Sequence, residues 1–164
     1  MKKSKLAVRN PKEGKIADLA NRTDHRTLAT WALDCAERVL PLFEKKHPED
    51  NRPRKAIEAL RAWVKTGVFR MADVRKASLD AHAAARAVMD DDAARSAARA
   101  AGQAMASAHV PRHAVAAAVY AATAIRDRAE GTKPDAAALK ERKWQYRRLL
   151  RLMKGFKALS RDLV

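Results

Sequence analysis

Apolar residues recur every three or four positions through most of this chain, which is the spacing of one face of an α-helix. After Asp24, for example, Leu28, Trp31, Cys35 and Val39 share such a face. Prolines and glycines fall between these segments, where helices begin or end. The pattern predicts helices over residues 24–47, 53–67, 71–89, 93–108 and 111–131 and from 132 onwards, with a short helix around 16–20.

The chain is therefore expected to be all-α, either a compact bundle or a short α-solenoid of about six helices. About half of residues 81–124 are alanine, which favours helix and adds so little bulk that neighbouring backbones can approach closely. A length of 164 residues fits one domain. We expect a basic N-terminal arm (1–23), an alanine-rich helical domain (24–131), and a basic amphipathic C-terminal helix (132–164) packed on that domain.

The positive charge is concentrated at the two ends of the chain. The formal net charge is +16, which bears on solubility and partners rather than on fold. Cations on one face of the last helix could contact a partner or phosphates, and Trp144 and Tyr146 beside them could stack on bases. The alternative is a solvated outer face on a helix whose leucine side docks on the bundle. The candidate contacts are Lys143, Arg147, Arg148, Arg151 and Lys154.

The candidates for catalysis and metal binding are few. His109 and His113 have a spacing that suits two metal ligands, but Pro111 lies between them and no matching ligand pattern accompanies them. His82 on an alanine face is expected to be a satisfied core histidine. Cys35 is expected to pack in the core, because it lies in the middle of an apolar helical stripe.

Asp34 and Glu37 do not share a face closely enough to suggest a carboxylate pair, so they are expected to be solvated. The sequence contains no phosphate-binding loop, dinucleotide-binding glycine pattern or serine elbow. We therefore predict that the chain is not an enzyme, that it uses no metal and no cofactor, and that a small-molecule substrate is not its partner.

The single cysteine rules out an internal disulfide framework and fits a reducing compartment. No apolar run approaches the roughly 20 residues that span a bilayer, and no apolar segment typical of a signal peptide follows the basic first residues. The sequence thus predicts a soluble, cytoplasmic protein without a membrane partner.

The segment WALDCAERVLPLFEKKHPEDNRPRKAIEALRAWVKTG, residues 31–67, carries a more specific signal. It resembles the Imm-five-like immunity proteins of bacterial polymorphic toxin systems. The later stretches AHAAAR (81–86) and AAGQAMASAH (100–109) are similar to the alanine-rich second half of that family. Its most distinctive piece is the Asp-x-Arg-Pro turn, and the motif residues are Trp31, Cys35, Asp50, Arg52, Pro53, Arg61, Trp63 and Gly67.

The resemblance implies a small helical protein that binds and neutralises a co-encoded toxin. It transfers no catalytic motif, so the turn residues are expected to have structural roles. Asp50 or Asn51 could cap the helix that Pro53 begins, and Arg52 could reach Asp34 or Glu37 on the preceding helix.

The charge narrows the choice of toxin, because inhibitors that capture basic nucleases tend to be acidic. The toxin is then acidic, or not a nuclease, or the basic ends serve another purpose. Two alternatives stay open: a nucleic-acid-associated module that uses the basic ends, and an oligomer formed through the alanine-rich face.

Overall fold

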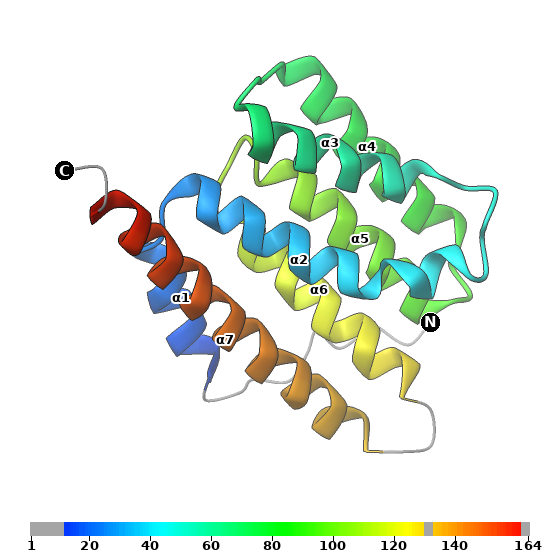
Figure 1. The fold of residues 1–164 in the computed structure, drawn as a ribbon. Helices are drawn as coiled ribbons and strands as arrows, with labels where there is room; N and C mark the ends of the chain where they lie inside the picture. Colours follow the sequence, from blue (N-terminus) through cyan, green and yellow to red (C-terminus); the bar gives the residue numbers. More distant parts are fainter. Residues whose placement is uncertain (1–11, 130–132, 162–164) are drawn as a thin grey trace.

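The computed structural model describes residues 12–129 and 133–161, with side chains for 14–129 and 133–155. All regular structure in these ranges is helical, which confirms the all-α prediction (Figure 1). The arrangement is a compact bundle rather than a solenoid. Its helices are α1 (Lys12–Asn21), α2 (His25–Glu44), α3 (Arg52–Thr66), α4 (Met71–Ala87), α5 (Asp92–Ala106), α6 (His113–Arg128) and α7 (Pro134–Arg161).

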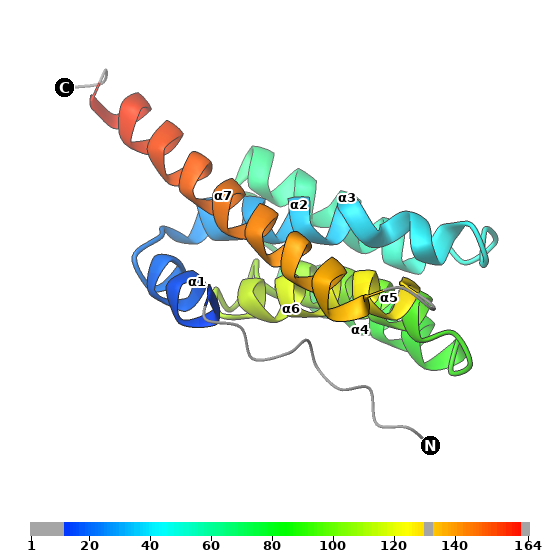
Figure 2. The same cartoon turned by 90° about the horizontal axis from the view of Figure 1, so that it is seen from below.

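The helix α5 lies at the centre and packs against α2, α3, α4 and α6. On one side of this centre α3 and α4 lie next to each other, and on the other side α7 packs against α6, α2 and α1 (Figure 1). Figure 2 shows α7 crossing the bundle obliquely, so that its C-terminal end extends past the other helices. The α3–α4 pair and the α7 helix therefore present two separate faces to solvent.

The short helix expected around residues 16–20 is present as α1, although it begins earlier, at Lys12. Ile16 is fully buried and Leu19 and Ala20 nearly so, because this apolar face packs on the bundle beside α7. Part of the predicted basic arm is thus a helix, while residues 1–11 of that arm lie outside the described residues.

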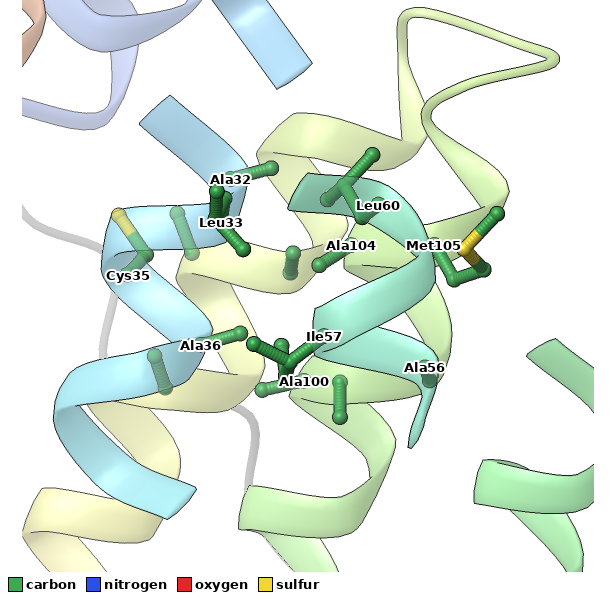
Figure 3. Packing of buried hydrophobic residues seen from close by; sticks show 14 of the residues in the cluster. Ala32, Leu33, Cys35, Ala36, Ala56, Ile57, Leu60, Ala100, Ala104 and Met105 are labelled. Carbon is green, nitrogen blue, oxygen red and sulfur yellow. The ribbon is translucent and has the colours of Figure 1, made fainter. Parts of the chain in front are cut away.

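Small and large side chains alternate between the packed layers. The helices α5 and α6 bury mostly alanine, whereas α2 and α3 supply bulkier groups such as Trp31, Phe43 and Ile57. Figure 3 shows Ile57 and Leu60 of α3 lying against Ala100 and Ala104 of α5. Pairing bulky with small residues lets the layers interdigitate at the density of a protein interior.

Several helix ends follow the chemistry expected from the sequence. The Asp24 carboxylate accepts a hydrogen bond of 2.9 Å from the backbone N–H of Thr27, and Asp91 caps α5 by accepting one of 2.9 Å from Ala94. Gly67 ends α3 with a φ of 70°, a left-handed conformation that glycine adopts without strain.

Other ends differ by a few residues. The helix α4 stops at Ala87, α5 stops at Ala106, and α6 begins at His113 rather than at Pro111. The helix α2 continues through Pro41 for one further turn, so that proline neither ends it nor starts a separate helix. The start predicted at Thr132 lies outside the described residues.

Candidate interaction surface

A polar network attaches α7 to the bundle. The indole N–H of Trp31 donates a 2.9 Å hydrogen bond to the backbone carbonyl of Gln145. The amide of Gln145 donates to the carbonyl of Ala118 on α6 at 2.9 Å, and its Oε1 accepts from Arg142 at 2.7 Å. Because Trp31, Gln145 and Arg142 are all buried, these bonds fix the position of α7 relative to α2 and α6.

Sequence reasoning missed this inner face. It assigned the docking side of α7 to leucines, but Glu141, Arg142 and Gln145 are buried there together with Leu149. Only the helical spacing could have revealed them, since these three positions extend toward the N-terminus the apolar stripe that begins at Leu149. Residue type pointed the other way, because charged side chains are rarely buried without a partner.

Two ion pairs flank this network. The guanidinium of Arg38 donates to both oxygens of Glu141, at 3.2 and 3.1 Å, and its centre lies 3.9 Å from the ring centroid of Trp144. Arg148 donates to Asp34 at 2.7 Å. The expectation that Asp34 is solvated is therefore wrong, and both Arg148 and Trp144 are already engaged within the protein.

Among the α7 residues whose side chains the structure describes, the remaining cations form an outward row of Lys140, Lys143, Arg147, Arg151 and Lys154, which we call the α7 basic row. All of them are exposed, and none forms an ion pair with the described residues. Beside the row, an open depression of about 360 Å³ is lined by Asp34, Glu37, Arg38, Trp144, Arg148 and Arg151. The row is thus an unneutralised positive surface.

The Asp-x-Arg-Pro turn is stabilised by hydrogen bonds between its own residues, Asp50 and Arg52. Arg52 donates to the two carboxylate oxygens of Asp50 at 2.8 and 2.6 Å, and the Arg52 backbone N–H donates to the same carboxylate at 3.2 Å. The hydrogen bond from Arg52 is the largest influence on Asp50 and lowers its pKa. Asn51 occupies the N-cap position without a side-chain hydrogen bond, and Pro53 follows in the first turn.

The prediction that Arg52 reaches Asp34 or Glu37 is wrong, because Arg52 folds back onto Asp50. Glu37 is not solvated as expected either: it forms a close ion pair with Arg61 and a longer one, of 3.8 Å, with Arg54. These pairs join α2 to α3.

The other motif residues pack or cap. Trp31 and Cys35 are fully buried, and the half-buried Trp63 lies 5.1 Å from the ring of His25. Pro53 is buried, and Gly67 donates its N–H to the Trp63 carbonyl at 2.8 Å. The motif residues therefore pack, cap or pair within the fold, and Arg61 and Trp63 connect α3 to α2.

Cys35 is placed as expected, in the core. Burial is the main cause that raises the pKa of its thiol well above the ordinary value, and the charges of Glu141 and Asp34 raise it further. A thiol in such surroundings stays protonated and is a poor nucleophile.

His109 and His113 both line one small hollow beside α4, but each has a different neighbour. His113 begins α6, and its Nδ1 lies 2.7 Å from Oε1 of Gln103, while the His109 ring lies 6.2 Å from that of Phe69. No group of three metal-binding side chains occurs among the described residues. His82 is partly buried and packs against Gly102 on α5. Its buried Nδ1 has no hydrogen-bond partner, so the expectation of a satisfied core histidine is wrong.

Comparison with known protein families gives a match that covers most of the fold. The model of the family described as Imm-5 like putative immunity protein matches residues 18–152, a range that includes all of α2 to α6 and most of α7. No curated protein and no solved structure matches the chain. Within the described residues, none of the helices combines the length and the apolar character needed to cross a membrane.

Proposed function

We propose that this chain, which belongs to the Imm-5 like putative immunity protein family, is a non-enzymatic binding protein that neutralises a cognate bacterial toxin. The observation that carries the proposal is the family match over residues 18–152. The roles of the candidate reactive groups support binding over catalysis: Cys35 is sealed in the core and His113 is held by Gln103. Neutralisation then depends on surface complementarity with the toxin.

The toxin is expected to act where the chain itself resides, which we propose to be the cytoplasm. The net charge of +16 favours a toxin whose contact surface is acidic, because complementary potentials accelerate association and like charges oppose it. An acidic toxin surface also agrees with the scarcity of unpaired carboxylates on α2 and α3.

The test combines genetics with stoichiometry. The chain is co-expressed with the products of its adjacent genes, and the protein that co-purifies with it is identified by mass spectrometry. Deleting the chain should make cells sensitive to that protein, and supplying the chain should restore growth. In a purified assay, inhibition of the toxin should saturate at one equivalent of the chain.

Inactivation of the toxin by far less than one equivalent would contradict a non-enzymatic mechanism. Unharmed deletion cells, together with no co-purifying protein, would contradict the function itself.

A second candidate function, a nucleic-acid-associated module, is favoured by the α7 basic row. Exposed cations in helical register can neutralise phosphates, and such binding weakens steeply with salt. The variant K143Q/R147Q/R151Q should then lose affinity for duplex DNA or RNA and show a smaller salt dependence. The control K45Q/K55Q/K65Q removes three exposed charges from α3 and the end of α2 and should retain binding; equal effects of both variants would leave only nonspecific charge attraction.

A further inference from the structure

Four large apolar side chains are exposed along the α3–α4 connection and the first half of α4. Val68 is 70% exposed, Leu79 56%, Phe69 40% and Met71 39%. We call these four residues the α3–α4 patch. The only other large apolar side chains that are exposed in the described part of the chain are Met89 and Leu139. Contiguous exposed apolar surface on a small protein marks an interaction site more often than isolated residues do.

The patch surrounds two hollows that share the side chain of Val74. One hollow, of about 380 Å³, is lined by residues that include Trp63, Val68 and Met105. The other, of about 150 Å³, is lined by residues that include Met71, Leu79 and His109. Hollows of this kind beside exposed apolar groups can receive apolar side chains of a partner, which is how the centre of a protein interface gains most of its affinity.

The connection that carries Val68 and Phe69 is held in place. Gly67 adopts its left-handed conformation and bonds back to Trp63, the N–H of Val68 donates to the Thr66 hydroxyl at 3.2 Å, and the Phe69 ring lies against His109. A surface that is formed before binding loses little conformational entropy when a partner docks.

Charges around the patch indicate which partner fits. The larger hollow is lined by both Arg70 and Asp73, which pair at 3.6 Å. Arg75 lines the smaller hollow and forms no ion pair with the described residues. A second copy of this chain docked face to face would bring like charges together, with +16 on each copy. A partner with carboxylates around its apolar groups fits instead.

We propose that the cognate toxin docks on the α3–α4 patch, inserts apolar side chains into the two hollows, and places a carboxylate beside Arg75. This inference rests on the proposed function and adds the contact face and the chemistry of the partner. The helices that carry the two surfaces, α3 and α4 on the one hand and α7 on the other, lie on opposite sides of α2, α5 and α6 (Figure 1). Variants of the two faces therefore report on different docking modes.

The probe is the toxin that co-purifies with the wild-type chain, and the measurement is its dissociation constant by biolayer interferometry. V68S/L79S removes two exposed apolar side chains and should raise the dissociation constant about tenfold or more. The matched control M89S/L139S removes the two exposed apolar groups outside the patch and should bind like wild type. R75E should slow association, most strongly at low salt, and R75K should restore it. Circular dichroism checks that each variant folds.

Wild-type affinity in V68S/L79S would overturn the inference while the proposed function stands, and loss of binding only in K143Q/R147Q/R151Q would place docking on α7 instead. A wild-type dimer in sedimentation that V68S/L79S abolishes would identify a second copy as the occupant and also overturn it. If the wild-type chain binds no toxin, the proposed function fails and this inference fails with it.

Discussion

Gly102 of α5 lies directly against the imidazole of His82 on α4: a Cβ added to Gly102 would come within 2.8 Å of Nε2 of His82. The Gly102 carbonyl also accepts a 2.9 Å hydrogen bond from the Ser78 hydroxyl, so α4 and α5 are in close contact at this point. Alanine in mid-helix gains about 1 kcal/mol over glycine, but overpacking a core costs about 1–3 kcal/mol. We expect G102A to lower the free energy of unfolding by about 1 kcal/mol in urea denaturation.

The control for this prediction is the same change made without the imidazole. In an H82A background the added methyl has room, so G102A should stabilise the protein through its helix propensity. The sign of the effect should therefore reverse between the two backgrounds. Equal effects of G102A in both would show that the ring does not limit the approach of α4 and α5.

Protonation of His82 should weaken the fold. Burial is the main cause that lowers the pKa of His82, and the charges of Arg99, Arg86 and His113 lower it further. The unfolded chain then binds the proton more readily than the folded one. The stability that neutral His82 contributes to the fold is therefore complete above the ordinary pKa of 6.5 and is lost as the pH falls below that value. Denaturation from about pH 7.5 to about pH 5.5 should show the loss.

Comparison with H82Q isolates this contribution, since both proteins share their carboxylates. The decline in stability on acidification should be smaller in H82Q, and smaller still in H82Q/H113Q, because burial also lowers the pKa of His113. Parallel curves for the wild type and H82Q would assign the acid sensitivity to other groups.

The Arg38–Glu141 pair should respond unequally to the loss of each partner. Glu141 is only 4% exposed at its side chain, whereas Arg38 is 44% exposed. R38M leaves the Glu141 carboxylate buried without that cation and also removes the contact with Trp144, so we expect a loss of about 2 kcal/mol. E141Q keeps an oxygen that can accept from Arg38, and about 1 kcal/mol is expected. Urea denaturation of both variants measures the difference.

Equal losses of unfolding free energy in R38M and E141Q would show that the burial of Glu141 adds no cost when its partner is removed, as in an ion pair on the surface. A matched surface control is D80N, which breaks the exposed ion pair between Lys76 and Asp80 and should cost less than about 1 kcal/mol.

The helices could be predicted from the sequence because each of them depends on local patterns. The caps Asp24 and Gly67 and the apolar stripe through Cys35 act within a few residues of their own positions, so they are visible without the fold. The short helix α1 was expected for the same reason, although its first turn, which adds Lys12 and Lys15, was not. Terminal turns depend on weak preferences and are the least certain part of such a prediction.

The ion-pair and hydrogen-bond partners of the polar side chains could not be predicted from the sequence. Arg148 meets Asp34, and the indole of Trp31 meets Gln145, across 114 positions of chain, and no local pattern encodes such a pairing. The α3–α4 patch was missed as well, because the exposure of Val68 and Leu79 depends on how α4 packs beside α3 and α5.

The thiol of Cys35 should be almost unreactive in the folded protein. It is fully buried, and burial raises its pKa, so both access and the thiolate fraction are low. The reagent DTNB at mildly alkaline pH should label the native chain orders of magnitude more slowly than the chain in denaturing guanidinium. A K55C variant, which adds a cysteine at an exposed position of α3, should gain one rapidly labelled thiol and serves as the positive control.

C35A should still neutralise the toxin once the variant is shown to be folded, because the proposed mechanism needs no nucleophile. Rapid labelling of native Cys35, together with loss of neutralisation in folded C35A, would instead give this thiol a chemical role and contradict a pure binding mechanism.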